Sequence, residues 1–291
     1  MAGDKKASSS PVVWIFVFVI VVIALWIAGG KSPGTKKLFF PPTYPIGPYP
    51  QAPAVLPQQE IKTAPETETE PEAETKTYKG EIRLNIRKAK ESNPDEEYII
   101  ITASYKNKKP ISISGWTLKG SRGNSATIGE GAYLVYAAQV NPQKPILLEP
   151  GAEAIVITGR SPIGTNFQLN KCIGYFNQFQ EFIPSLPQKC PEPEDEVGVR
   201  ELPDACIDYL KQLKRCEIPL TKPHNISPEC NSFVDENINY SGCVNNHRND
   251  PDFFEKDWRI YLNREEELWK NQYETITIYD QDGRIVAQES Y

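Results

Sequence analysis

The stretch ISISGWTL at residues 111–118 decides the fold. Its first residues alternate between apolar and small polar side chains, and this alternation is typical of a strand with one face in a protein core. A tryptophan in such a strand is far more often a core residue of a β-sandwich than a platform for a ligand. We therefore expect a β-rich domain around this stretch, with Trp116 buried.

Short strands are also expected on both sides of this stretch. The runs that predict them lie at residues 81–86, 98–102, 132–137, 146–148 and 154–158. Gly, Pro and Asn residues separate these runs, and Pro150-Gly151 marks a turn between the last two. Strands at this spacing predict a mainly β fold, an antiparallel sandwich rather than a sheet of βαβ units.

Several motifs resemble the lamin-tail domain, the immunoglobulin-like domain of nuclear lamins that also occurs in bacterial surface proteins. Its members show a Glu-Tyr strand, a turn with Asn, a Gly-Trp-x-Leu strand, and Leu-x-Pro-Gly before an apolar strand. The corresponding residues here are 97–99, Asn107, 115–118, 148–151 and 154–157. The resemblance implies an Ig-like sandwich at residues 80–171 and an arrangement like that of membrane-anchored lamin-tail proteins of small-genome bacteria.

The last residues, ETITIYDQDGRIVAQESY at 274–291, resemble the closing hairpin of that domain, with residues 280–283 as its turn. The resemblance therefore implies that residues 172–270 are an insertion and that residues 271–291 close the sandwich. Asp280, Asp282, Gly283 and Glu289 also match positions of a calcium loop. The first ligand position is Ile278, however, so we expect a hairpin turn.

The N-terminal part predicts a membrane anchor and a stalk. Residues 12–28 carry no polar side chain and are long enough to approach the thickness of a bilayer core. Because only a weak cleavage site follows, we interpret residues 1–30 as an uncleaved signal anchor, a single transmembrane helix. Lysines lie on both sides of it, so the positive-inside rule leaves its orientation open. Residues 31–79 are rich in Pro, Glu and Thr, which predicts a disordered stalk.

The cysteines indicate the compartment. All six (Cys172, Cys190, Cys206, Cys216, Cys230 and Cys243) follow the apolar segment, and an even number predicts disulfides in an extracytoplasmic region. Two helices are expected, at residues 203–216 and from Ser227 with Gly242 as its stop, and a third near residues 253–269. If the first two are antiparallel, their geometry pairs Cys206 with Cys243 and Cys216 with Cys230, which leaves Cys172 for Cys190. Six cysteines allow fifteen pairings, so this is one geometric hypothesis.

Catalytic chemistry is weakly indicated. The two histidines are His224 and His247. Zinc at His247 with Cys230 or Cys243, or a Cys–His nucleophile pair, would require free thiols, so we expect no metal, cofactor or catalytic residue. The acidic run Glu192, Glu194, Asp195 and Glu196 is interpreted as a solvated loop.

The expected function is a membrane-anchored cell-surface structural or binding module for an extracytoplasmic protein or glycan. A net charge of −6 argues against nucleic acid as the partner. The alternative is an envelope hydrolase or accessory enzyme with its site in the insertion. That alternative requires a pocket combining His247 with Asp250 or Asp252.

Overall fold

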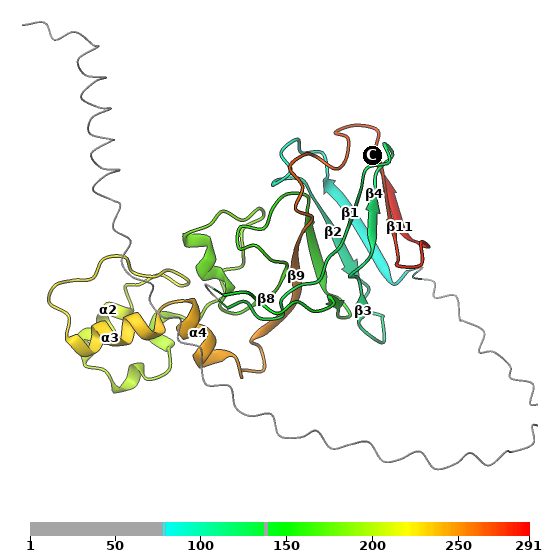
Figure 1. Ribbon diagram of the computed structural model, residues 1–291. Coiled ribbons are helices and arrows are strands. Elements are labelled where there is room, and N and C mark those ends of the chain that lie inside the picture. The colour runs from blue at the N-terminus through cyan, green and yellow to red at the C-terminus, as the bar shows by residue number, and fades with distance from the viewer. Residues whose placement is uncertain (1–77, 79, 137–138) are drawn as a thin grey trace, which may run out of the picture. The chain divides into compact units, whose positions relative to one another are not determined.

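The computed structural model describes residue 78 and residues 80–136 and 139–291, and this part is mainly β with a disulfide-rich helical region (Figure 1). The predicted anchor at residues 1–30 and, except for Tyr78, the predicted stalk at residues 31–79 lie outside the described residues. Within the described ranges, no helix has both the length and the apolar character needed to cross a bilayer.

Three sheets form a sandwich-like arrangement. The first contains, in spatial order, β1 (Ile82–Lys88), β2 (Tyr98–Ala103), β7 (Glu153–Ile157), β9 (Phe254–Tyr261) and β8 (Phe167–Asn170). The second contains β11 (Ile285–Ser290), β10 (Thr275–Tyr279), β4 (Thr117–Lys119) and β5 (Ser125–Thr127). The third is the pair β3 (Ile111–Ser112) and β6 (Leu147–Leu148). All paired strands are antiparallel except β7 and β9.

The main core is built from the inward positions of these strands. Ile99 and Ile101 alternate inward along β2, and Leu118 of β4 and Ile278 of β10 meet the same cluster. Trp116 is 1 % exposed, which confirms the predicted core position. Burial of a side chain of this size is among the largest single contributions to a core.

Tyr78 belongs to this core rather than to the stalk. Its ring lies edge-on to Trp116, with 5.1 Å between the ring centroids, and the residue is buried. The packed region therefore includes at least one residue before the expected start at Gly80.

The closing hairpin forms as predicted, and β10 pairs with both β11 and β4. Asp280 Oδ1 accepts the backbone N–H of Asp282 and of Arg284, and Gly283 adopts a φ of +77°. The acidic residues at this turn thus hold the backbone of the hairpin.

Two of the expected strands differ in the structure. The run at 111–118 is divided into β3 and β4 because Gly115, at a φ of +82°, turns the backbone between them. The expected strand at 132–137 is represented, among its described residues, by a single bridge between Ala132 and Phe167. Farther along, the backbone N–H of Tyr136 binds the Asn141 side chain instead of a neighbouring strand.

The prediction of a helix near residues 253–269 is wrong. Its first half is strand β9, which pairs in parallel with β7 and antiparallel with β8. The last four residues of β9 are Trp258, Arg259, Ile260 and Tyr261, and all four are buried. This part of the strand therefore shows no two-residue period that would distinguish it from a helix.

The helical region leaves the sheet after β8 and returns to it before β9. The two ends meet, since Lys171 N donates to Phe253 O at 2.8 Å. Between them lie the 3-10 helices η1 (Ile173–Gln178), η2 (Pro193–Asp195) and η3 (Val199–Glu201), and the α-helices α2 (Asp204–Leu210), α3 (Pro228–Asn237) and α4 (Tyr240–His247).

The predicted caps are correct in part. Ser227 accepts the N–H of Cys230 and Pro228 is the first residue of α3, as expected. The helix ends at Asn237, however, and Asn239 begins α4 by accepting the N–H of Gly242. Gly242 is therefore in the first turn of a new helix and does not stop the previous one.

Two smaller cores support this region. The first joins the end of the sheet to η1 and α4, and contains Phe167, Phe182, Tyr240 and Phe253. The second lies among η3, α2 and α3, and contains Leu210 and Val234. The helical region thus shares one core with the sheet and has another of its own.

Candidate functional site

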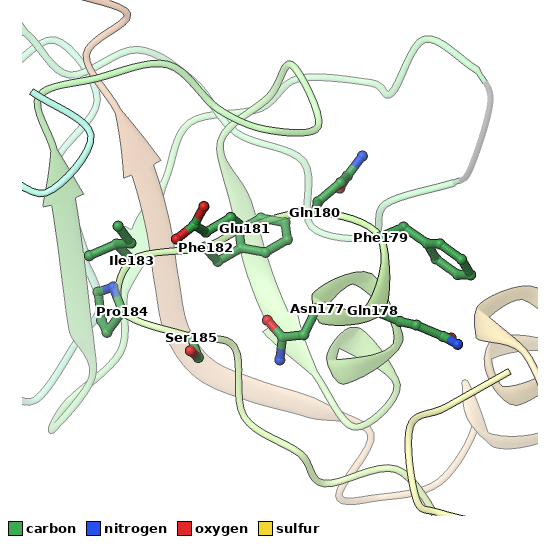
Figure 2. A pocket seen from close by; sticks show the side chains of 9 residues that line it. All are labelled: Asn177, Gln178, Phe179, Gln180, Glu181, Phe182, Ile183, Pro184 and Ser185. Atoms are coloured by element: carbon green, nitrogen blue, oxygen red, sulfur yellow. The ribbon is translucent and has the colours of Figure 1, made fainter.

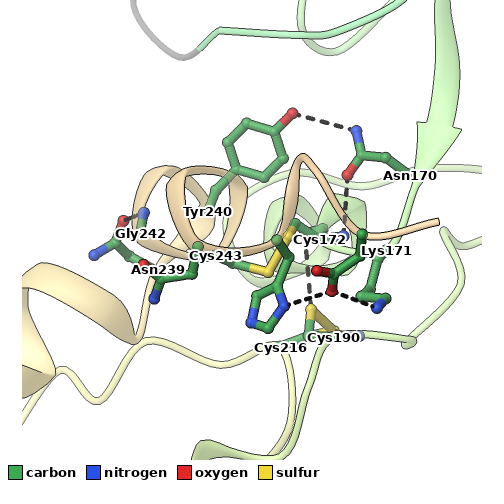
Figure 3. Close-up of a disulfide and its surroundings, with 12 residues drawn as sticks. Asn170, Lys171, Cys172, Cys190, Cys216, Asn239, Tyr240, Gly242 and Cys243 are labelled. Carbon is green, nitrogen blue, oxygen red and sulfur yellow. Dashed lines mark hydrogen bonds and ion pairs between the residues drawn. A yellow bond between two sulfur atoms is a disulfide. The ribbon is translucent and has the colours of Figure 1, made fainter. Parts of the chain in front are cut away.

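All six cysteines form disulfides, but in a different pairing from the predicted one. The bonds are Cys172–Cys243, Cys190–Cys216 and Cys206–Cys230. Each predicted pair is therefore wrong. Figure 3 shows Cys172, next to the end of β8, bonded to Cys243 of α4, with the Cys190–Cys216 bond close by.

The prediction failed because the two helices are shorter than expected. The first ends at Leu210, and Cys216 lies beyond it with a φ of +57° and bonds to Cys190. The second is interrupted at Ile238, so Cys230 and Cys243 lie on different helices. Cys206 of α2 is instead bonded to Cys230, which lies in the first turn of α3.

His247 lies between two carboxylates at the end of α4. Its Nδ1 is 2.9 Å from Asp250 Oδ2 and its Nε2 is 3.0 Å from Glu196 Oε2. Lys171 completes the network through Asp250 at 3.0 Å and Asp252 at 2.6 Å. Burial of Lys171 opposes its charge, but the hydrogen bonds to these two carboxylates outweigh this and raise the pKa of its amine. The hydrogen bonds from His247 and Lys171 hold the pKa of Asp250 below its usual range.

Glu196 corrects the interpretation of the acidic run as a solvated loop. Its side chain is 1 % exposed, whereas Glu194 and Asp195 before it are exposed. A buried carboxylate requires hydrogen-bond partners, and Asn246 joins His247 in supplying them.

This network contains the residues that the hydrolase alternative named. His247 does contact Asp250, but both of its ring nitrogens are engaged within the protein. A general base needs a nitrogen within reach of a substrate proton. Cys230 and Cys243, the candidate zinc or nucleophile partners, are both in disulfides. The network therefore connects the end of α4 to Glu196, which follows η2. The other histidine, His224, is exposed on a loop and takes no part in it.

A second candidate site is the loop at residues 177–185, which we call the 177–185 loop. Two side-chain amides fasten its beginning. Asn177 donates to Leu186 O and accepts from Leu186 N, and Gln178 makes the same pair of bonds with Ile218. Phe182 anchors the middle of the loop, buried edge-on against Phe167.

The rest of the loop is presented to solvent. Figure 2 shows Phe179 and Glu181 extending in different directions from the loop, with Gln180 between them. Phe179 is 59 % exposed, which is unusual for a phenylalanine held on a fastened loop. Gln180 Oε1 is buried and has no hydrogen-bond partner among the described residues. The loop thus carries an apolar ring and a carboxylate, both exposed, on the two sides of Gln180.

Three hollows border the 177–185 loop. One, of about 650 Å³, is lined by the loop itself. A second, of about 600 Å³, lies beside Gln180, Phe176 and Val140. The third, of about 350 Å³, lies beside Glu181 and Ile183, and we call it the acidic hollow. Its lining consists of Asn93, Asp95, Glu96, Arg160, Ser161, Pro162, Glu181, Ile183 and Tyr261.

The acidic hollow is held by the turn before β2. Asp95 Oδ1 accepts the backbone N–H of Arg160 at 3.1 Å, and Asn93 donates to Glu96 Oε1 at 2.9 Å. The approach to Asp95 requires a glycine, since a Cβ on Gly159 would lie 1.9 Å from Asp95 Oδ1. The Asp95 carboxylate is therefore held close against the backbone of Gly159 and Arg160.

Sequence reasoning did not find this surface. The predicted site residues were the cysteines and His247, which lie in the interior of the helical region, whereas Phe179 and Glu181 carry no motif. The one available signal was an aromatic residue between polar amides, in the run FNQFQEF at residues 176–182.

Comparison of the chain with models of protein families, with curated proteins and with solved structures found no match.

Proposed function

We propose that this protein is a non-enzymatic binding module displayed outside the cytoplasm on a membrane anchor, and that the 177–185 loop with its three hollows is its binding surface. The observation that carries the proposal is Phe179, an exposed ring on a loop fastened by Asn177, Gln178 and Phe182. A rigid exposed aromatic residue lowers the entropy cost of binding, and such residues dominate interface energies.

Three disulfides in the helical region support an extracytoplasmic location. The apolar residues 12–28 are the proposed single span, and the proposed partner is a protein or a glycan of the cell envelope. The test is to block free thiols on intact cells that make the protein, digest it without reduction, and map the linked peptides by mass. We expect no free thiol in the folded region. Six free thiols would place this region in the cytoplasm and remove the proposal.

The binding surface is tested with a matched pair of variants. Phe179→Ala removes the exposed ring of the loop, and Tyr105→Ala removes a ring that is 73 % exposed elsewhere. Full-length protein in micelles is mixed with sedimented cell envelopes, and the bound fraction is measured. We expect Phe179→Ala to weaken association about tenfold, within the range for an aromatic anchor, and Tyr105→Ala to leave it unchanged. Equal binding of the two variants and the unchanged protein would exclude the loop.

We also propose that the sandwich is a lamin-tail-like domain. Two features support this: β4, which follows Gly115-Trp116, pairs with β10 of the closing hairpin, and the helical region leaves and re-enters at adjacent residues. A variant with residues 172–251 replaced by a short Gly-Ser linker, which removes all six cysteines, tests whether the sandwich folds without the helical region. We expect cooperative unfolding of the shortened chain, reported by tryptophan fluorescence, whereas a non-cooperative transition would show that the sandwich depends on the helical region.

A further inference from the structure

We propose that the acidic hollow binds an organic cation, the guanidinium or ammonium group of a basic ligand. This inference rests on the proposed function, because it gives the chemistry of one part of the same binding surface. It depends on the charges that line the hollow, on one unpartnered hydroxyl and on the fixed position of the surrounding turn.

The lining carries more negative than positive charge. Asp95, Glu96 and Glu181 contribute three carboxylates, and Arg160 contributes one cation. Arg160 has a carboxylate partner of its own, Glu265, which is outside the lining. Three carboxylates against one cation leave the lining with an excess of negative charge, which attracts a positive group.

Each of these carboxylates retains an oxygen for a ligand. Asp95 and Glu96 use one oxygen each, for Arg160 N and the Asn93 amide respectively. Glu181 is exposed, and none of the described residues donates a hydrogen bond to its carboxylate. Guanidinium and ammonium groups supply several N–H donors, which suits a lining that offers mainly acceptors.

Tyr261 provides evidence for a ligand that does not depend on the acidic side chains. It lies at the end of β9, is only 5 % exposed and lines the hollow, and its hydroxyl has no hydrogen-bond partner among the described residues. A buried hydroxyl without a partner costs free energy, and such groups in native proteins call for an explanation. Burial raises the pKa of this phenol, so the hydroxyl remains neutral and leaves an unused acceptor position in the wall of the hollow.

The shape of the site favours an organic ion over a metal ion. No group of three or more His, Cys, Asp or Glu side chains in the described part of the chain is placed to hold one metal ion. The carboxylates border a space of about 350 Å³ instead, which is in the size range of small-molecule sites. Ile183 and Pro162 add apolar walls that suit the methylene groups next to a charged terminus.

The test uses full-length protein in micelles and the capped peptide acetyl-Gly-Arg-Gly-amide, with acetyl-Gly-citrulline-Gly-amide as the uncharged ligand of the same shape. Binding is measured by calorimetry at low and high salt. We expect the arginine peptide to bind at least about tenfold more tightly than the citrulline peptide, and less tightly at high salt. Equal binding of the two peptides, or no binding of either, would overturn the proposal.

Three variants locate the site. Glu181→Gln is expected to weaken binding of the arginine peptide about fivefold, as loss of one exposed ion pair would. Tyr261→Phe is expected to weaken it about threefold without lowering the unfolding midpoint, because the removed hydroxyl has no partner in the protein. Glu149→Gln, at an exposed carboxylate outside the hollow, is the control and should change nothing. A loss of the same size in the control would overturn the assignment to this hollow.

Methylguanidinium and butylammonium distinguish the source of the cation. Binding of the peptide well above that of methylguanidinium points to a side chain of a protein partner, whereas equal binding points to a small amine. Failure of this inference is separable from failure of the proposed function. If no cation binds while association with envelopes still depends on Phe179, the hollow is excluded and the binding module stands.

Discussion

The Glu196 carboxylate lies 3.0 Å from Nε2 of His247, and the two side chains are 1 % and 12 % exposed although they lie 51 positions apart along the chain. Glu196 follows η2 and His247 ends α4, so this contact joins two elements that no disulfide connects directly. Removal of one partner leaves the other buried without a matched group, which costs more than removal of both.

We therefore expect His247→Ala to lower the free energy of unfolding by about 2–3 kcal/mol. The double variant Glu196→Gln/His247→Ala should lose less than the sum of the two single variants. Urea unfolding followed by circular dichroism at 222 nm measures this, with His224→Ala as the exposed control. Strictly additive losses would mean that the two side chains do not stabilise each other.

The disulfides should differ in which part of the protein they stabilise. Cys206–Cys230 lies in the core of η3, α2 and α3, whereas Cys172–Cys243 lies in the core shared with the sheet. From the loss of chain entropy in the unfolded state, Cys206–Cys230, which closes a loop of 24 residues, should stabilise the folded state by about 3 kcal/mol. Cys172–Cys243 closes a loop of 71 residues and should contribute at most about 4 kcal/mol, because the other two bonds shorten that loop.

Two spectroscopic signals separate these effects. Trp116, Trp258 and Trp269 belong to the main core, and no tryptophan lies between residues 172 and 252. In Cys206→Ser/Cys230→Ser we expect a weaker helical signal with the tryptophan transition unchanged. In Cys172→Ser/Cys243→Ser the tryptophan transition should also move to lower denaturant. Identical transitions in both variants would contradict the division into two cores.

Replacement of Trp116 should strongly destabilise the sandwich. It is 1 % exposed and packs against Tyr78. Trp116→Ala removes a fully buried ring and should lower the free energy of unfolding by about 3–5 kcal/mol, whereas Trp116→Phe should cost less because it keeps a ring. Urea unfolding followed by the remaining tryptophans checks the order, and a cost below about 1 kcal/mol for the alanine variant would contradict the core position.

Stability should fall in acid partly through Glu274. Burial opposes ionisation of this carboxyl, but the N–H donors of Ser121, Lys270 and Thr275 outweigh it and hold its pKa below the usual range. A group with a lowered pKa in the folded state stabilises the protein above its unfolded value, near 4, and loses this contribution as pH falls through the folded value.

Glu274→Gln should therefore be about 1–2 kcal/mol less stable at pH 7, and its stability should fall less between pH 5 and pH 3. Unfolding midpoints across this range measure the effect, with Glu149→Gln as control. Glu97 acts in the opposite direction, because burial raises the pKa of its carboxyl despite hydrogen bonds from Leu268 and Trp269. Ionisation of Glu97 therefore lowers the stability of the folded state as pH rises. If the pH profile of Glu274→Gln equals that of the unchanged protein, carboxyls other than Glu274 control the acid transition.

The start of α4 should depend on one side chain. Asn239 accepts the N–H of Gly242, and Asn239→Ala should cost about 1 kcal/mol, as is usual for loss of an N-cap. The helical signal at 222 nm during urea unfolding measures it, and Asn225→Ala on an exposed loop is the control. An equal effect of both variants would show that the cap is not needed.

Local patterns in the sequence were sufficient for several features. The strands at residues 98–102 and 274–279, the turn at residues 280–283, the burial of Trp116, and the Ser227-Pro228 start of α3 were all predicted correctly. Each is decided by residues that are neighbours in the chain, through side-chain periodicity, turn chemistry or capping. The formation of disulfides followed from the number and position of the cysteines.

The tertiary structure alone decided the rest. The partner of each cysteine depended on where α2 and α3 end, and the burial of Glu196 depended on His247 arriving from α4. The identity of β9 depended on an open place between β7 and β8. The acidic hollow joins Asp95, Arg160, Glu181 and Tyr261, which lie up to 166 residues apart. These features arise from contacts between distant segments, and the periodicity of one segment carries no information about which other segment will pack against it.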